Sequence, residues 1–463
     1  MMFSKFARTA ARSPAARSVL SRASSTTATA TRSNAASRLM FGLGAAGLGA
    51  SAALMTVADR ERRAEMAPAN SVFGMLEQLT ARMDKIEQAL GVGLSVFSDE
   101  IEKIRKTRGT NPGNRACKYF DEDYFSKLGL PLQQRLIQIV RTGFENSDSG
   151  LGCYAMQPDD YETFGEFFDQ VIQDYHGAGA DAVHETDWDI SSIGENGVLD
   201  VKKLGLPELS MRVRVGRNLE GFSLPGSMDR AERVKFEKRM LKAFAALQAN
   251  PEYGGKVYSL TPDFDGGKNP NLISASKYDQ LIKAHVMFKD MDADPYLKSA
   301  GIASDWPYGR GCWQSDDGQC IIWFGEEDQL RIMCMKKGSK LNEVFNRLKK
   351  MLDTVEGIEG IKFAHSNKYG YITSCPSNLG TGMRASVHVK IPNLTKDGTD
   401  TKAKAIAKPL GLSVRGTGGE HTPIGADGTV DISPSARLFI KEKDIVAALY
   451  KGIELLMEQE NKN

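Results

Sequence analysis

The sequence predicts an α+β fold, in which a small all-helical N-terminal domain precedes a larger domain with an antiparallel sheet flanked by helices. Helical spacing of apolar residues dominates residues 117–177. Strict alternation of apolar and polar residues, typical of half-buried strands, occurs at residues 211–216 and 383–391. Beyond residue 206 strands and helices follow no regular βαβ rhythm, which favours antiparallel pairing. The 463 residues are enough for both domains.

Residues 1–66 are predicted to be a targeting presequence with an apolar sorting or anchor segment. Residues 1–58 contain seven Lys or Arg and no Asp or Glu, and residues 39–57 carry no charge. Such a start is typical of organellar transit peptides, although a disordered basic tail has a similar composition. The apolar run is at the lower limit for a bilayer span, and membrane association through it is a prediction. The remaining chain is mildly acidic, which predicts no nucleic-acid binding.

Residues 67–113 are predicted to form a coiled-coil-like helix and a linker. Apolar residues recur with alternating spacings of four and three, as in a coiled-coil seam: Val72, Leu76, Leu79, Met83, Ile86 and Leu90. Four more apolar residues continue the stripe: Leu94, Phe97, Ile101 and Ile104. We therefore expect self-association through residues 72–104, and the alternative is a helix that packs on the chain's own body. The glycines and the proline of residues 107–114 indicate the linker.

Residues 114–200 are predicted to be the helical domain and residues 206–460 the sheet-containing domain. In the helical domain, Leu132, Leu136 and Ile139 are spaced as on one face of a helix, and a polar loop follows at residues 146–161. The later elements are predicted from apolar runs and periodicity: a strand at 211–216, a helix at 230–248, a short apolar strand at 319–325, helices at 339–352 and 442–458, and strands within 369–391.

The stretch 369–391 carries the strongest chemical signal. It reads as a strand, a tight loop and a second strand, which predicts a hairpin. Apolar residues form one face of the second strand: Met383, Ala385, Val387, Val389 and Ile391. The other face carries cationic and hydroxyl groups that can line an anion site: Arg384, Ser386, His388 and Lys390. Two glycines in the loop 377–382 allow backbone N–H groups to approach a ligand closely.

The string CPSNLGTGMRASVHV at residues 375–389 resembles the signature block of the phosphagen (ATP:guanidino) kinases. Three further blocks resemble family motifs and lie in family order: SGLGCY at 149–154, GEEDQLR at 325–331 and RGTGGEHT at 415–422. The resemblance implies an energy-buffering kinase that transfers the γ-phosphoryl group of MgATP reversibly, without a covalent enzyme intermediate. Glu420 and the SGLGCY loop favour L-arginine over creatine as the acceptor. The alternatives are a kinase for taurocyamine, lombricine or creatine, and a non-catalytic scaffold.

The resemblance assigns nucleotide binding to arginines from four separate segments. Planar guanidinium groups suit this role because they bind phosphate oxygens bidentately and stay charged. Five match the positions that hold the triphosphate of ATP and the transferring phosphoryl group: Arg212, Arg214, Arg331, Arg384 and Arg415. Their neighbours assigned to the nucleotide are Ser210, Met211, Val213, His285, Ala385, Ser386, Val387, His388, Gly416, Thr417, Gly418, Gly419 and Glu420. The sequence has no metal-ligand cluster with usable spacing, and Mg²⁺ is expected to arrive with ATP.

The resemblance assigns the acceptor to two carboxylates, a thiol and a loop. Glu327 and Glu420 match acids that grip a guanidinium and would hold it in line with the phosphoryl group. Cys375 matches a substrate-contacting cysteine, whose thiolate nearby cations are expected to favour. The loop residues over the acceptor are Gly150, Leu151, Gly152, Cys153 and Tyr154. The residues expected to act on the reacting groups are Glu327, Glu420, Cys375, Arg331, Arg384 and Arg415.

Three positions depart from the family pattern, and one more feature bears on location. Gly325, Gln329 and Gln314 stand where the family carries Asn, His and His, so altered kinetics are expected there.

A basic presequence followed by an apolar segment resembles the leader of mitochondrial creatine kinases and implies the mitochondrial intermembrane space or inner membrane. The six cysteines form no CxxC pair and are predicted to be reduced thiols, mostly in the core.

Overall fold

The structure is a computed structural model that describes residues 79, 96–264, 266–417, 424–425 and 427–462. The predicted presequence, its apolar segment 39–57 and most of the predicted coiled coil lie outside these residues. Among the residues described, no helix combines the length and the apolar character that crossing a bilayer requires.

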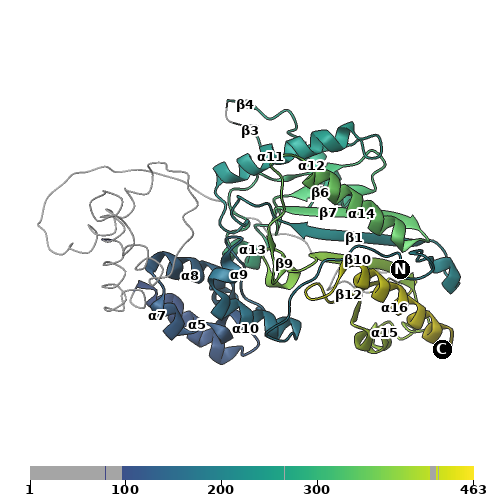
Figure 1. Cartoon of the computed structure of the whole chain (residues 1–463), viewed down its shortest axis with the longest axis horizontal. Helices are drawn as coiled ribbons and strands as arrows, with labels where there is room; N and C mark the ends of the chain where they lie inside the picture. Colours follow the sequence, from purple (N-terminus) through teal and green to yellow (C-terminus); the bar gives the residue numbers. More distant parts are fainter. Residues whose placement is uncertain (1–78, 80–95, 265, 418–423, 426, 463) are drawn as a thin grey trace, which may run out of the picture. The chain divides into compact units, whose positions relative to one another are not determined.

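A helical domain precedes the sheet, as the spacing of apolar residues predicts (Figure 1). Asn114 begins its second helix by accepting a hydrogen bond from the Cys117 N–H at 3.1 Å. Leu132, Leu136 and Ile139 are buried in the core of this domain. The helices are α5 (Ser98–Thr110), α6 (Arg115–Tyr119), α7 (Glu122–Lys127), α8 (Leu130–Glu145), α9 (Asp160–Thr163) and α10 (Gly165–His176).

Helix α5 corrects two expectations for residues 67–113. The helix runs into the region predicted as linker and packs against α6 and α8. Ile101 and Ile104 were expected in a seam between two copies, but their side chains are 3% and 0% exposed in the core of the helical domain. The alternative, packing on the chain's own body, therefore holds for this part of the stripe. Leu79, the described residue of the earlier stripe, is 56% exposed.

The larger domain is built on an eight-stranded antiparallel sheet with the strand order β11-β12-β10-β1-β7-β6-β5-β2. The two stretches predicted from alternation are β1 and β10, and they pair with each other at the centre of the sheet. The strands are β1 (Leu209–Arg217), β2 (Lys256–Ser259), β5 (Gly311–Gln314), β6 (Cys320–Phe324), β7 (Leu330–Gly338), β10 (Met383–Lys390), β11 (Leu412–Arg415) and β12 (Thr429–Pro434).

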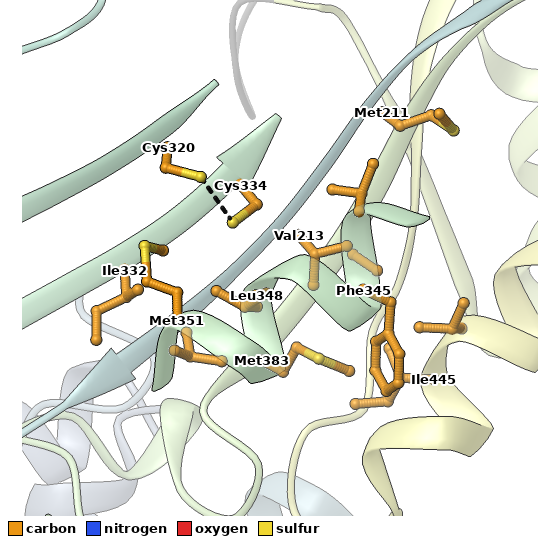
Figure 2. Close-up of a cluster of buried hydrophobic side chains, with 14 of the residues drawn as sticks. Met211, Val213, Cys320, Ile332, Cys334, Phe345, Leu348, Met351, Met383 and Ile445 are labelled. Atoms are coloured by element: carbon orange, nitrogen blue, oxygen red, sulfur yellow. Dashed lines mark hydrogen bonds between the residues drawn. The ribbon is translucent and has the colours of Figure 1, made fainter. Parts of the chain in front are cut away.

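Helices α11 (Arg230–Ala249), α14 (Leu341–Glu356) and α16 (Glu442–Lys462) cover one face of this sheet (Figure 1). Apolar side chains such as Met211, Val213 and Met383 meet Phe345 of α14 and Ile445 of α16 there (Figure 2). The other face carries the arginines of β1 and β10 and, towards β5 and β6, a smaller apolar cluster with Cys312, Ile321 and Met333. The remaining elements are η1 (Val201–Leu204), β3 (Asp263–Phe264), β4 (Gly267–Lys268), α12 (Ala275–Lys283), α13 (Pro295–Ser299), β8 (His365–Ser366), β9 (Gly370–Tyr371), η2 (Pro376–Asn378), α15 (Thr401–Ala407) and η3 (Lys408–Leu410).

The predicted hairpin over residues 369–391 is wrong. Strand β9 pairs with β8 in a separate two-stranded sheet, whereas β10 pairs with β1 and β12. The residues between β9 and β10 form η2 and an irregular turn, in which Gly380 and Gly382 have φ of +89° and +58°. Pro376 has no N–H to donate to a ladder, which favours the irregular path.

The helical domain and the larger domain share part of one hydrophobic core. Tyr369, Ile372 and Leu379 belong to the core cluster of the helical domain. The Tyr161 hydroxyl donates to the Thr373 carbonyl at 2.7 Å. These contacts fix residues 369–380, which lead into the predicted anion site, against α9 and α10.

Candidate functional site

The alternation of β1 places two arginines on the sheet face opposite the helical core. Met211, Val213 and Val215 of this strand are buried in the core, so Arg212 and Arg214 point to the other face. In the antiparallel register, Arg214 lies directly opposite Arg384, and Arg212 lies opposite Ser386. Two guanidinium groups from segments far apart in sequence are thereby brought together. Four residues predicted to bind nucleotide have side chains in the core instead, so at most their backbone can reach it: Met211, Val213, Ala385 and Val387.

The other two predicted arginines lie on strands of the same sheet. Arg331 of β7 is opposite Gly216, and Arg415 ends β11. The five arginines therefore come from β11, β10, β1 and β7, four of five consecutive strands in the sheet. The strand order thus places arginines that are scattered in sequence on neighbouring strands of one sheet.

The strand between β11 and β10 supplies a carboxylate that the sequence analysis missed. Asp431 of β12 is 5% exposed, and its Oδ2 lies 3.3 Å from Arg384 Nη2 and 3.6 Å from Arg415 Nε. Its Oδ1 lies 3.9 Å from His388 Nε2. A single acid inside the otherwise uncharged string of β12 was the available signal. One buried carboxylate thus bridges and orients Arg384 and Arg415 on this side of the sheet.

The arginines of this cluster are buried and repel one another. Burial, together with the charges of Arg331 and Arg212, lowers the pKa of Arg214 well below its usual value. Burial also lowers the pKa of Arg212, where Asp431 opposes the shift and Arg331 and Arg415 add to it. Guanidinium groups remain protonated near neutral pH, so the repulsion is relieved when a polyanion binds. The cluster is therefore suited to a triphosphate.

A turn between β6 and β7 carries three acids beside the arginines. Arg331 Nη2 lies 2.8 Å from Glu326 and 3.9 Å from Glu327. Burial, and then the charges of Asp328 and Glu326, raises the pKa of Glu327 to about 7, against the opposing effect of Arg331. Asp328 accepts hydrogen bonds from Asn218 Nδ2 at 2.8 Å and from the Ser374 N–H at 2.7 Å. Glu327 is thus a carboxyl group that can change its charge near neutral pH.

Two of the departures from the family pattern have structural roles. Gly325 has φ of +77°, and a Cβ atom there would lie 2.1 Å from the Gly309 carbonyl oxygen. Gln329 is fully buried, accepts from the Leu219 N–H at 2.8 Å and donates to the Ser223 carbonyl at 2.8 Å. Both residues stabilise the backbone that carries the acids. Gln314, the third departure, ends β5 and pairs with Ile321 of β6.

Cys375 corrects the expectation of a thiolate favoured by cations. Burial, and then the charge of Glu327, raises the pKa of this thiol to about 12. Its Sγ lies 3.0 Å from the Ser377 hydroxyl oxygen. The group is therefore a neutral thiol near neutral pH.

A small cleft of about 50 Å³ lies between the arginines and the acidic turn. Its walls bring together the predicted residues Arg214, Arg331, Arg384 and Glu327. They also contain Arg437, which no sequence motif indicated and whose Nη1 donates to the Ser377 carbonyl at 3.1 Å. Asn378 was missed as well, and its Nδ2 lies 3.5 Å from Glu327 Oε2.

The SGLGCY loop is anchored to α6 on one side and to the cysteine turn on the other. The Ala116 N–H donates to the Leu151 carbonyl at 2.9 Å, as the Arg115 N–H does to Gly150 at 3.2 Å. After the loop, the Ala155 N–H donates to the Ser374 carbonyl at 2.7 Å, one residue before Cys375.

Within this loop, burial, and then the charge of Glu327, raises the pKa of Tyr154 well above its usual value. The side chain of Cys153 is buried in the core of the helical domain, so only its backbone can meet a ligand. Gly152 has φ of +76°, and a Cβ atom there would lie 2.6 Å from Asn114 Oδ1. The tight packing fixes the path of the loop beside the cleft.

The remaining predicted residues differ in how well the structure places them. His388 is beside Asp431, and Ser210 is opposite His388 in the register. His285 is exposed just beyond α12, and no described hydrogen bond or ion pair joins its ring to the arginines. Gly416 and Thr417 follow β11, whereas Gly418, Gly419 and Glu420 lie outside the described residues.

The acids near the arginines are engaged by guanidinium groups, Glu326 by Arg331 and Asp431 by Arg384 and Arg415. In the part of the chain that the structure describes, no three His, Cys, Asp or Glu residues gather as a metal site would require.

The chain is similar to known proteins over most of the described region. Two family models match: the N-terminal domain of the ATP:guanido phosphotransferases over residues 113–173, and their C-terminal catalytic domain over residues 235–463. It is 36% identical over 360 residues to a testis creatine kinase of Oncorhynchus mykiss, covering 75% of this chain and 88% of that one. It is 36% identical over 348 residues to an arginine kinase of Amphioctopus fangsiao, covering 74% and 94%.

A solved structure has the same fold. The duplicated taurocyamine kinase of Schistosoma mansoni, with bound components of a transition-state analogue, matches with a TM-score of 0.66 and 32% identity. The match covers 79% of this chain and 48% of the duplicated protein, so this chain spans about half of that structure's length. The helical domain, the antiparallel sheet and these similarities together show that the chain belongs to the ATP:guanidino phosphotransferases, the phosphagen kinase family.

Proposed function

We propose that this protein is an arginine kinase, which transfers the γ-phosphoryl group of MgATP reversibly to the guanidinium of L-arginine, giving phosphoarginine and ADP. The observation that carries the proposal is the cleft in which Arg214, Arg331 and Arg384 face Glu327. Relatives at comparable identity are named for creatine and arginine. The choice of arginine rests on Glu420 and on the SGLGCY loop.

The arginines would act on the nucleotide. Arg214 and Arg384, opposite each other in the sheet, can hold phosphate oxygens from two sides, and Arg212 and Arg415 extend this surface. Arg331 lies between the phosphate side and the acids, and binding of a phosphoryl group would compete with its ion pair to Glu326. Preorganised cations stabilise the charge that spreads over the transferring group. A bound Mg²⁺ would neutralise further charge on the phosphate oxygens.

The acids would act on the acceptor. Ionised Glu327 can bind two guanidinium nitrogens and hold the attacking nitrogen in line with the phosphoryl group. That nitrogen forms the new N–P bond as the bond to the ADP oxygen breaks, and it loses a proton. With a pKa of about 7, Glu327 can accept this proton. Glu420 is proposed as a second carboxylate on the guanidinium.

A substrate panel tests the proposal. Purified protein is given MgATP with arginine, creatine, taurocyamine or lombricine, and ADP formation is measured by a coupled assay. We expect the highest kcat/KM with arginine. A higher value with another acceptor reassigns the substrate and keeps the family chemistry, whereas no turnover with any of the four favours the non-catalytic scaffold.

Replacing Glu420 with Val is expected to lower kcat/KM for arginine about 100-fold or more, since it removes one carboxylate from the guanidinium. The KM for MgATP is expected to change less than about threefold, because the arginines that hold the phosphates stay in place. Glu359→Val, at an exposed glutamate on the loop after α14, serves as the control. A large loss of MgATP affinity with unchanged arginine turnover would show that Glu420 belongs to the nucleotide side.

We further propose that residues 1–66 direct the protein to mitochondria, to the intermembrane space or the inner membrane, with residues 39–57 associating with the membrane. The acid-free basic start and the uncharged run that follows support this proposal. A fluorescent protein fused behind residues 1–66 is expected to enter mitochondria. Its presence in the cytosol alone would refute the targeting role.

Residues 72–95 are proposed to mediate self-association, since their 4-3 stripe suits a partner helix. We compare by light scattering the protein beginning at Ala67 with a version beginning at Val96, which keeps α5 and its buried Ile101 and Ile104. The longer form is expected to contain more chains per particle than the shorter form, and the two forms are expected to have equal kinase activity. Equal oligomeric states of the two forms would refute the proposal.

A further inference from the structure

Cys320 and Cys334 face each other across two adjacent strands. They are directly opposite in the antiparallel pairing of β6 with β7, and their Sγ atoms are 3.4 Å apart. Figure 2 shows the two sulfur atoms pointing toward each other above side chains of α14. Both are free thiols, 0% and 1% exposed. The proposed kinase chemistry uses neither of them.

The backbone places the pair where side chains of opposite strands come closest. The Met335 N–H donates to the Gln319 carbonyl at 2.7 Å, so Gln319 and Met335 form a hydrogen-bonded pair. The next pair along the strands, Cys320 and Cys334, is therefore a non-hydrogen-bonded pair. Cys320 directs its own N–H and carbonyl to Ser315, away from β7. At non-hydrogen-bonded positions the Cα atoms are about 4.5 Å apart, within the range of about 4.4–6.8 Å that disulfides span. The bond can therefore form without a change of strand register.

A polar cluster of Arg347, Asp317 and Gln319 lies near the two thiols, since the charges of Arg347 and Asp317 act on Cys320. Arg347 of α14 forms an ion pair with Asp317 at 2.7 Å and donates to Gln319 Oε1 at 3.1 Å. The side chains of this ion pair are 19% and 38% exposed, so its opening would admit a small molecule. The hydrogen bond from Cys334, and then the charge of Arg347, lowers the pKa of Cys320 against the effect of burial. A thiolate is the form that attacks oxidants.

We propose that Cys320 and Cys334 form an oxidative modification site, a dithiol that hydrogen peroxide converts into a cross-strand disulfide. The Cys320 thiolate attacks one peroxide oxygen: an S–O bond forms, the O–O bond breaks, and the leaving hydroxide takes up a proton to become water. The Cys334 sulfur then attacks the sulfenic sulfur. The S–S bond forms, the S–O bond breaks, and the hydroxyl leaves as water with the Cys334 proton. Two thiols lose two electrons, and one peroxide is reduced to two waters.

The bond would join the two strands that carry the acidic turn. The ring it closes, residues 320–334, contains Glu327 and Arg331. Cys320 and Cys334 belong to the core under α14, whereas Met333 of β7 belongs to the apolar cluster on the other face. Oxidation therefore restrains the turn and adds no group to the cleft. We expect a more stable protein whose KM for MgATP is unchanged.

The test uses the reduced full chain, treated with hydrogen peroxide while folded. Free thiols are then alkylated, and the digested protein is analysed by mass spectrometry. We expect a linked pair of peptides that contain Cys320 and Cys334, with the loss of two hydrogen atoms, which dithiothreitol separates. The melting midpoint is expected to rise by about 5 °C on oxidation and to return on reduction.

Single variants separate this pair from the other cysteines. Cys334→Ala and Cys320→Ala are expected to lose the linked peptides and the rise in melting midpoint. Cys312→Ala removes a buried cysteine of β5 that belongs to the cluster on the other face of the sheet, and it is expected to keep both effects. The proposal is overturned if both thiols stay alkylatable after peroxide, if either ends as a sulfinic acid, or if it pairs with another cysteine. An equal rise in Cys334→Ala would also overturn it.

Discussion

Replacing Arg384 with Ala lowers kcat by about 10²–10³-fold, the cost of removing one preorganised charge from a site that stabilises a developing anion. Arg384 is held on the sheet by two contacts, since its Nη2 lies 2.7 Å from Ser433 Oγ and 3.3 Å from Asp431 Oδ2. The variant leaves Asp431 with Arg415 as a partner, so the fold is expected to survive. Steady-state kinetics with MgATP and arginine, together with circular dichroism, measure the two effects.

Two further variants make this result specific. Arg384→Lys keeps the charge and loses the planar fork, and we expect a smaller loss of kcat than for Ala. Lys390→Ala removes a cation from the exposed end of the same strand, where it pairs with Asp427, and is expected to leave kcat unchanged. A folded Arg384→Ala protein with kcat within a few-fold of the original would refute the proposed phosphate clamp.

Replacing Glu327 with Gln lowers kcat/KM for arginine by about 10²–10⁴-fold, because the neutral amide neither neutralises the guanidinium nor accepts its proton. The KM for MgATP is expected to change little. Glu343→Gln, on the exposed side of α14 where Glu343 pairs with Lys336, serves as the control and keeps wild-type kinetics. Equal kcat/KM for arginine in the Glu327→Gln protein would show that this acid does not hold the acceptor.

The same residue gives the reaction a pH dependence with a defined sign. The pKa of Glu327 is raised to about 7, so the group is neutral below this pH and charged above it. A guanidinium cation binds the charged form, and kcat/KM for arginine therefore falls as the pH drops through 7. Calorimetry in two buffers of different ionisation enthalpy at pH 7 is expected to show release of about half a proton per arginine bound. In Glu327→Gln this release disappears.

Periodicity predicted single strands well because burial of one face is local information. Alternation at 211–216 and 383–391 identified β1 and β10 and placed their arginines on the polar face. It contains no information about neighbours, so the pairing of β10 with β1 in place of a hairpin could not be read from it. The direct opposition of Arg214 and Arg384 is a product of that pairing.

Residues that act on other residues were the hardest to predict. Asp431 and Arg437 lie in segments without a recognised motif, and their importance comes from arginines and backbone that lie far away in sequence. The same holds for Cys375. Nearby arginines were expected to favour its thiolate, but burial raises the pKa of the thiol instead. The predicted packing partner of α5 was wrong because an apolar stripe can pack equally well on a second copy of the chain or on the chain's own core.

The core shared by the two domains makes them one thermodynamic unit. Tyr369, Ile372 and Leu379 follow the helical domain by some two hundred residues and fill its interior together with Phe168. Separated from them, the helices would expose the apolar surface that these side chains cover, and segment 369–380 would lose its support. Each part therefore depends on the other for its free energy of folding, and heat or denaturant is expected to unfold both in a single cooperative transition. The boundary between the two family models marks a division of the sequence across a continuous folding unit.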